Sequence, residues 1–234
     1  MTSSDRYPAH APGAGGSLRK QDWAYEQIRE WIINGELPPG SRIEQEQLAT
    51  RLSISRIPLR EGLARLSAEG LLHGRAHQRL IVTELTLEDA RDVYCGREAL
   101  EGVLAAEAAT RAGGRELSEL RTILDAQRSL LSAGDADDFR RCDRDFHHAV
   151  YRLAGMPKTF NAVTGLFAMS QRYVRLYLSD ADRTASSYRE HAEILAAIEA
   201  GDGDLAARLT REHVRRGLVS LEETLRVPAA SGPD

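Results

Sequence analysis

The order of periodic patterns along the chain constrains its fold more than any single residue does. Residues 20–70 carry three successive helical patterns, and the apolar period then becomes strand-like in two short segments, at 71–72 and 80–82. From residue 85 onward the patterns are helical again. Three helices followed by a hairpin with a polar tip predict a winged helix-turn-helix, and the remainder predicts a helical bundle. The expected fold class is therefore mainly α.

Breaks between the patterns predict two domains with a tail at each end. The winged helix-turn-helix is expected over 18–84 and the helical domain over 85–227. Glycine-containing breaks, together with a polar break at 179–186, divide the second domain into an antiparallel bundle of six or seven helices. The tails, 1–17 and 228–234, are expected to be disordered, the first because it is rich in Pro, Gly and Ser.

Composition excludes some classes of protein and says little about partners. The 234 residues contain no apolar run long enough to span a membrane, and the N-terminus lacks the basic start and apolar middle of a signal peptide. We therefore expect a cytoplasmic location without membrane association. Cys95 and Cys142 are expected to be free, buried thiols. The net charge of −4 does not by itself indicate a nucleic-acid partner.

The first and third predicted helices each present one apolar face to a core. The third has Ser55 as its expected N-cap, Pro58 in its first turn and a stripe that includes Leu59 and Leu63. The expected stripe of the first helix consists of Trp23, Ala24, Gln27, Ile28, Trp31 and Ile32.

The start of the third helix carries the residues expected to bind DNA. Arg56 and Arg60 are four residues apart and project from one side of this helix, away from its apolar stripe. Arginine can bind guanine O6 and N7 through two hydrogen bonds, and the Ser55 hydroxyl suits a phosphate oxygen. A helix face that contacts only solvent is the alternative. The residues expected to reach DNA from the hairpin tip are Arg75, His77 and Arg79.

Residues 31–82 closely resemble the GntR family of bacterial regulators. The resemblance implies a bacterial, nucleoid-associated regulator in which Arg56 reads a base and Arg60 contacts a base or the backbone. Glu46 departs from the family pattern, since some members carry an arginine there that touches DNA. The matching residues are Gly35, Pro39-Gly40, Gln47-Leu48-Ala49, Leu52, Ser55-Arg56, Pro58-Leu59-Arg60-Glu61, Leu66, Glu69-Gly70-Leu71 and Val82.

An aspartate and three histidines lie on inward-facing positions of the helical domain. Asp143 and His147 are one turn apart on the face that also carries Phe146. His191 shares a face with apolar residues of a later helix, and His213 lies in line with inward positions of the last one. Burying such groups is costly unless they are paired, and a divalent metal would pair all four. A hydrogen-bonded Asp/His pair and ordinary core histidines are the alternatives.

The same residues resemble the FadR-type (FCD) C-terminal ligand-binding domain. The similarity spans about 85–225, and it includes Asp143-x-x-Phe146-His147, Glu190-His191 and His213. In metal-binding members the four equivalent positions coordinate an ion, often zinc and sometimes nickel or manganese. The resemblance therefore implies a divalent-metal site with zinc expected, and a small-molecule effector.

Arg97 is the residue expected to hold an anionic effector. It is in step with inward apolar positions of its helix, so its guanidinium needs a carboxylate, which either an effector or Glu101 supplies. The expected protein is a homodimeric repressor, not an enzyme, that binds double-stranded operator DNA and is released by a small carboxylate. The alternatives are a purely structural helical domain, a metallohydrolase and an activator.

Overall fold

The computed structural model describes residues 17–74, 79–112, 114–178 and 180–226. The chain divides into two compact units, with the boundary between Leu85 and Thr86. The predicted tails lie outside the described residues, except that Ser17 belongs to the first helix and not to a tail. The expected mainly α fold is confirmed, and the described strands are limited to one short hairpin in the first unit.

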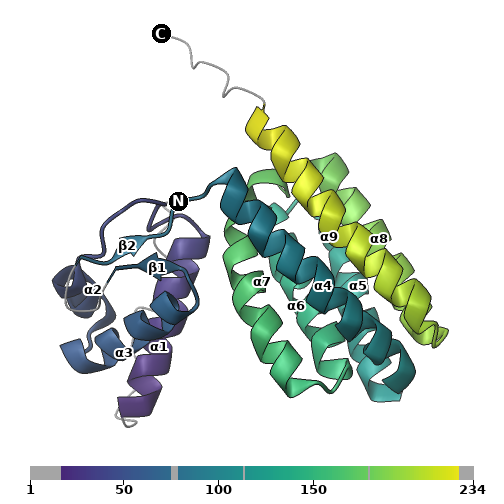
Figure 1. Ribbon diagram of the computed structural model, residues 1–234, viewed down its shortest axis with the longest axis horizontal. Coiled ribbons are helices and arrows are strands. Elements are labelled where there is room, and N and C mark those ends of the chain that lie inside the picture. The colour runs from purple at the N-terminus through teal and green to yellow at the C-terminus, as the bar shows by residue number, and fades with distance from the viewer. Residues whose placement is uncertain (1–16, 75–78, 113, 179, 227–234) are drawn as a thin grey trace. The chain divides into compact units, whose positions relative to one another are not determined.

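The first unit has three helices followed by the hairpin, as the sequence predicts (Figure 1). The strands are antiparallel, with Leu72 opposite Val82, and Arg42 forms an isolated bridge with Ile81 at the other edge. The elements are α1 (Ser17–Ile33), α2 (Gln45–Leu52), α3 (Arg56–Ala68), β1 (Leu72–His73) and β2 (Ile81–Val82).

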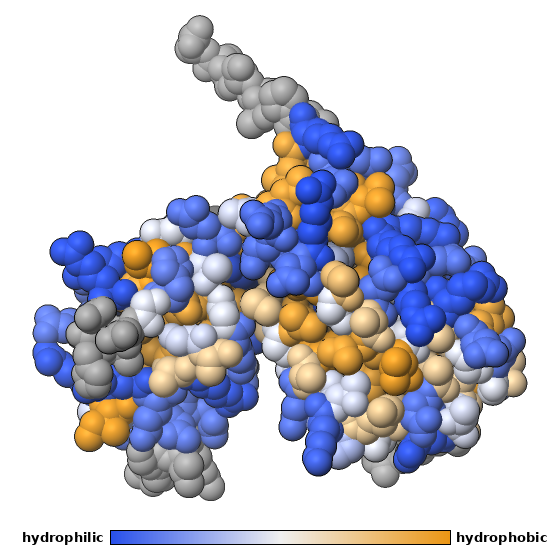
Figure 2. Space-filling view, in the orientation of Figure 1, coloured by the Kyte–Doolittle hydropathy of each residue, from blue (hydrophilic) through white to orange (hydrophobic). Residues whose placement is uncertain are grey.

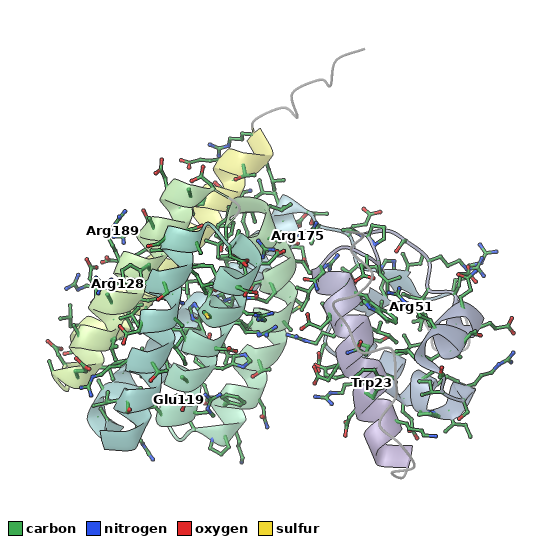
Figure 3. All side chains as sticks on the ribbon, turned by 180° about the vertical axis from the view of Figure 1, so that it is seen from behind. Trp23, Arg51, Glu119, Arg128, Arg175 and Arg189 are labelled. Carbon is green, nitrogen blue, oxygen red and sulfur yellow. The ribbon has the colours of Figure 1, made fainter. Side chains whose placement is uncertain are left out.

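Close packing of α1 against α3 forms the core of the winged unit. A Cβ atom at Gly62 would lie 3.0 Å from the backbone nitrogen of Tyr25, tighter than an ordinary van der Waals contact, so glycine favours this close approach. Ile28 and Leu59 are fully buried at the contact. The predicted burial of Trp23 was wrong, since this residue is only partly buried on α1 (Figure 3). It lies one position before Ala24, which occupies the centre of the buried stripe.

The turn between α2 and α3 is fixed by two serines. Ser53 has φ 53°, a left-handed conformation that ends α2, and its backbone N–H donates to carbonyls of that helix. Ser55 is extended and occupies the N-cap position of α3, as predicted, but its side chain makes no capping hydrogen bond. Its hydroxyl is therefore not used by the helix that it begins.

The second unit contains six helices within its described residues (Figure 1). Thr86 caps the first by accepting a hydrogen bond from the backbone N–H of Asp89. The predicted break at 179–186 was too long, because Asp180 caps a new helix that begins at Ala181. The helices are α4 (Leu87–Arg111), α5 (Gly114–Ala133), α6 (Ala136–Leu153), α7 (Pro157–Tyr177), α8 (Ala181–Glu199) and α9 (Gly203–Arg226).

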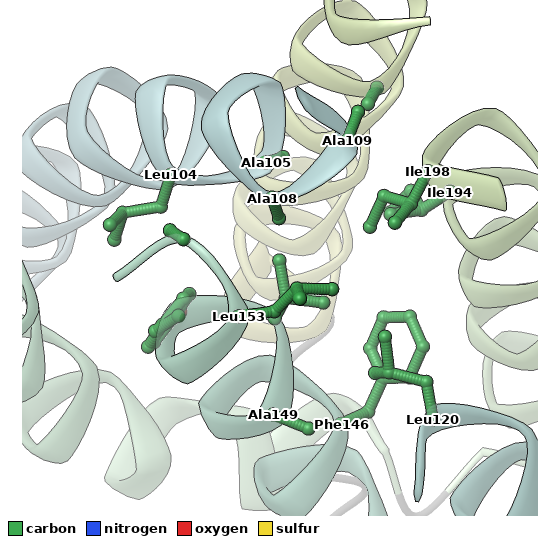
Figure 4. Close-up of a cluster of buried hydrophobic side chains, with 14 of the residues drawn as sticks. Leu104, Ala105, Ala108, Ala109, Leu120, Phe146, Ala149, Leu153, Ile194 and Ile198 are labelled. Atoms are coloured by element: carbon green, nitrogen blue, oxygen red, sulfur yellow. The ribbon is translucent and has the colours of Figure 1, made fainter. Parts of the chain in front are cut away.

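Helix α4 lies at the centre of the bundle and packs most extensively against α9. The close approach of α9 to α4 uses glycine, since a Cβ at Gly203 would lie 3.1 Å from the Ala106 carbonyl oxygen. The core beside α4 contains the small residues Ala105 and Ala108 and the large residues Phe146 and Ile194 (Figure 4). Polar side chains such as Glu119 on α5 project outward (Figure 3). Among the described residues, no helix is both long and apolar enough to cross a membrane.

The two cysteines are free, as expected, but they are not both buried. Cys142 is partly buried and Cys95 is exposed. Cys95 follows the buried residues Val93 and Tyr94 on α4, at the point where the helix surface turns toward solvent.

Candidate metal centre and DNA-binding surface

Four side chains predicted from the sequence meet inside the helical unit. Asp143 and His147 come from α6, His191 from α8 and His213 from α9. One ligand atom from each lies within 4.8 Å of the others, and all four residues are buried. The spacing of four residues places Asp143 and His147 on one face of α6, as the sequence indicates. This set of three nitrogen ligands and one oxygen ligand can hold a divalent metal ion.

Each of the three imidazoles has its Nδ1 atom next to an oxygen acceptor from outside the group of four. An acceptor next to Nδ1 favours the tautomer that carries the ring proton there, because a neutral imidazole has one N–H. The Nε2 atoms are then left with lone pairs. The three pairs are His147 with Glu101 at 3.0 Å, His213 with Glu190 at 2.6 Å and His191 with Gln127 at 3.0 Å.

The Nε2 atoms of these histidines converge. Those of His147 and His213 lie 3.2 Å apart, and that of His191 is buried without a hydrogen-bond partner and lies 3.6 Å from Asp143 Oδ1. Facing lone pairs repel one another unless a cation lies between them. The donor set and its buried, unpartnered nitrogen therefore fit a metal ion, and the oxygens at Nδ1 act as the outer partners that orient metal-bound histidines.

Burial keeps two of the histidines in the form that binds metal. It lowers the pKa of His191 and of His213 well below the ordinary value, with nearby imidazoles adding to the effect. Both rings are thus neutral at pH 7. Burial also raises the pKa of Asp143, which means that its carboxylate lacks sufficient positive partners within the protein itself.

The sequence did not identify all of the residues that support this centre. Gln127 is fully buried on α5, and Glu190 is buried on α8 next to His191. Gln127 lies one heptad after the buried residue Leu120, so an inward amide on an apolar stripe was the available signal. For Glu190, adjacency to His191 gives no such signal, because consecutive helix positions do not share a face.

A small cavity adjoins the metal-binding residues, and its walls combine charged and hydroxyl side chains with apolar ones. Arg97, the residue predicted to bind an anion, lies on its wall. The same guanidinium also forms a buried ion pair with Glu101 at 2.6 Å and donates to Ser170 Oγ at 3.0 Å. The cavity is lined by Tyr94, Arg97, Asp143, His147, Val174, Tyr177, Leu178, Arg183, Ser187, His213, Val214 and Gly217.

Glu101 connects Arg97 to the metal-binding group. One carboxylate oxygen contacts Arg97 and the other lies 3.0 Å from His147 Nδ1. Burial alone would raise the pKa of Glu101, but the charges of Arg97 and His147 outweigh it and hold that pKa well below the usual range. Burial would likewise lower the pKa of Arg97, yet Glu101 raises it. The pair is therefore ionised, and the predicted Glu101 alternative is realised at Arg97.

Arg183 is a second arginine on the cavity wall, and no pattern in the sequence indicated it. It lay within the predicted break at 179–186, whereas the structure places it in the first turn of α8. Its terminal nitrogens contact both carboxylate oxygens of Glu190 at 3.3 Å, and its Nε is buried with no hydrogen-bond partner among the described residues. Arg183 thus links the cavity to the residue that binds His213.

The predicted DNA-binding residues lie at the start of α3 and in the hairpin. Arg56 is the first residue of α3, is largely exposed, and forms an ion pair with Glu46 of α2. Arg60 is partly buried one turn later, and Arg79 is exposed beside β2. The predicted contacts of Arg75 and His77 lie outside the described residues.

Comparison with known proteins identifies the family. The gntR family of bacterial regulatory proteins matches residues 20–82, and the FCD domain matches residues 92–216, more than half of the chain. The chain belongs to the GntR family. A relative from Paenarthrobacter nicotinovorans, described as a probable D-xylose utilization operon transcriptional repressor, is 30% identical over 80% of this chain and 84% of its own length. This GntR protein is accordingly a DNA-binding transcriptional regulator and not an enzyme, which overturns the metallohydrolase alternative.

Other comparisons agree with this assignment. The HTH-type transcriptional repressor RspR of Escherichia coli K12 is 24% identical to this GntR regulator, over 82% of the chain and 84% of the relative. The solved structure of E. coli McbR/YncC superposes with a TM-score of 0.79 at 22% identity, covering 88% of this chain and 99% of that one. A structure from Rhodococcus sp. RHA1 gives a TM-score of 0.71 at 21% identity, over 87% and 98%. These structural matches support the winged and helical architecture.

Proposed function

We propose that this GntR regulator is a metal-containing, homodimeric repressor that a small carboxylate releases from operator DNA. The observation that carries the proposal is the convergence of the Nε2 atoms of three histidines. The Nδ1 atom of each of these rings lies next to an oxygen of Glu101, Gln127 or Glu190. Such an arrangement is costly without a cation and is accounted for by one.

Asp143, His147, His191 and His213 are the residues that would hold the ion. Three imidazoles and one carboxylate favour zinc, and nickel and manganese are the alternatives. When bound, the ion supplies a fixed positive charge at the wall of the cavity. The protein residues then have two tasks, which are to fix the orientation of the rings and to exclude bulk water through burial.

A carboxylate effector is supported by the charges that face the cavity. Arg97 and Arg183 both line it, and the hydroxyl groups of Tyr94 and Tyr177 lie 3.0 Å apart on its wall. One of these hydroxyl groups donates to the other, so two guanidinium groups and one hydroxyl donor face a small anion that accepts hydrogen bonds. Because Arg97 already pairs with Glu101, we expect it to bind the effector only by sharing its remaining donors.

Operator binding is assigned to α3 and the hairpin. Arg56 and Arg60 would contact bases or backbone, the Ser55 hydroxyl a phosphate, and Arg75, His77 and Arg79 the minor groove or backbone. Repression is proposed because the relatives from P. nicotinovorans and E. coli are described as repressors.

A homodimer is supported by apolar side chains that the helical unit leaves exposed. Val103 on α4 and Val219 and Leu225 on α9 are each between two-fifths and just over one-half exposed, and α4 and α9 pack side by side. Apolar patches lie among polar ones on the face that carries these helices (Figure 2). A two-fold dimer would bind a pseudo-palindromic operator.

Effector binding can weaken DNA affinity only if the effector prefers a state that binds the operator poorly. Such coupling is typically about 5–150-fold in affinity, and it is reciprocal. The test is to identify acids released from the denatured protein by mass spectrometry and to titrate them into the protein with and without operator. We expect weaker effector binding in the presence of operator. If the acid binds equally well with and without operator, it is not an inducer. If the protein contains neither an acid nor a metal, a purely structural helical domain is favoured.

A further inference from the structure

Ile57 is a large apolar side chain that faces solvent at the start of the DNA-binding helix. It is 68% exposed, more than any other exposed large hydrophobic residue that the structure describes. The others lie on α4, α7 and α9 in the helical unit, where oligomerisation can cover apolar surface. Within the described part of the winged unit, Ile57 stands alone in this respect.

Helical geometry places Ile57 at the centre of the exposed face of α3. It precedes the fully buried Leu66 by nine residues, about two and a half turns, so the two side chains point in opposite directions. Arg56 is its neighbour, and Arg60 lies one turn later toward the same side. The exposed residue Ala64 follows on this face and, being small, lets a groove wall approach the helix.

We propose that Ile57 is a base-reading residue that contacts the 5-methyl group of a thymine in the operator major groove. The inference rests on the proposed entry of α3 into that groove. A branched aliphatic side chain makes no hydrogen bonds, and the thymine methyl is the apolar group that distinguishes a base pair at the major-groove edge. Arg56 and Arg60 lie to one side of Ile57 and supply positive charge that brings the helix against the phosphates, while the exposed Glu61 lies to the other side.

The expected size of the effect follows from the apolar surface removed from water. Covering one methyl group contributes about a four-fold change in affinity, from the burial of roughly one CH₂ equivalent. A two-fold operator presents the contact twice, so the effect on a dimer is about fifteen-fold. The effect depends on the methyl group alone, so it can be separated from hydrogen-bond readout by arginine.

The experiment compares thymine with uracil in DNA, since deoxyuridine lacks only the 5-methyl group. Random-sequence duplex libraries are amplified with either dTTP or dUTP and selected in parallel with the full-length protein, with Ile57→Ala and with the control Leu176→Ala. For wild type and for Leu176→Ala we expect a symmetric pair of T positions that is enriched in the dTTP library and lost in the dUTP library. For Ile57→Ala the two libraries should give the same motif.

A selected duplex, synthesised with deoxyuridine at these positions only, then gives the affinity change directly. Wild type should lose about fifteen-fold and Ile57→Ala less than two-fold. Identical motifs for wild type in both libraries would overturn the role of Ile57 and leave the arginines untouched. If no sequence were enriched in either library, the assignment of α3 to operator binding would fall, and this inference with it.

Discussion

The carboxylate of Glu190 accepts a hydrogen bond from Nδ1 of His213 at 2.6 Å. The same carboxylate contacts Arg183 on the cavity wall, so one acidic residue joins a proposed metal ligand to a proposed anion site. Loss of the negative charge at Glu190 should therefore affect both metal binding and anion binding. Outer partners of this kind fix the tautomer and orientation of a metal-binding histidine.

Replacement of this carboxylate should weaken metal binding without unfolding the protein. For Glu190→Gln we expect metal affinity to fall about 10–100-fold, because the amide holds the ring less strongly. Competition with a chromophoric chelator measures this change. Glu193→Gln is the matched control, since Glu193 is exposed on the same helix. Equal affinities for the two variants would show that Glu190 does not support the centre.

The buried ion pair between Arg97 and Glu101 should be far more important for stability than an exposed pair on the same helix. Arg97→Ala leaves Glu101 uncompensated, and the free energy of unfolding should fall by about 3–5 kcal/mol. Arg111→Ala, which breaks the exposed pair with Glu107, should cost less than about 1 kcal/mol. Urea denaturation of the metal-free proteins gives both values. Similar losses in the free energy of unfolding for the two variants would mean that burial adds little to the importance of the Arg97–Glu101 pair for stability.

Operator recognition should depend on Arg56. Because this side chain is exposed, Arg56→Ala should leave the fold and the dimer intact while it removes a base contact of about 1–3 kcal/mol. Arg60→Ala should also weaken binding. Electrophoretic mobility shifts at one fixed salt concentration, with operator and scrambled DNA, measure the loss of selectivity. Arg128→Ala on α5 serves as a charge-matched control. Selectivity equal to wild type in Arg56→Ala would refute the placement of α3 in the groove.

Dimerisation should depend on the exposed apolar positions of α4 and α9. A charge at Val219 would have to be buried in the proposed interface, so Val219→Asp should raise the dimer dissociation constant at least about ten-fold. Sedimentation equilibrium across micromolar concentrations measures the change. Wild type that sediments as a monomer would contradict the dimer, and a variant that associates as wild type does would place the interface elsewhere.

The sequence predicted local features well because they depend on short spacings. The pair Asp143 and His147 follows from a separation of one helical turn, and the N-cap position of Ser55 follows from its place before α3. The inward position of Gln127 could have been inferred from its apolar stripe, but its contact with His191 of α8 and the place of Arg183 on the cavity wall arise from packing between helices. Asp180 is the N-cap of α8, but aspartate is also common in loops. The start of α8, and with it the helical position of Arg183, was therefore not recognised from the sequence.

The alternatives left open at Arg97 show the same limit. The inward position of Arg97 was predictable from helical periodicity, but whether its partner is Glu101 or a ligand was not. The structure shows that Glu101 lies close enough to pair with Arg97 and His147 at once. Such three-residue arrangements depend on side-chain geometry between α4 and α6, which spacing along the sequence does not determine.

Metal content measured on the purified protein tests the central claim most directly. We predict about one divalent ion per chain in wild type by elemental analysis, and strong depletion in His147→Ala, His191→Ala and His213→Ala. Wild type should also be stabilised by added zinc, by about 2.7 kcal/mol at a free concentration one hundred times the dissociation constant. His148→Ala is the control, because His148 lies outside the group of four on α6 and should retain the ion. Wild-type protein that binds no metal after incubation with zinc, nickel or manganese would contradict the account.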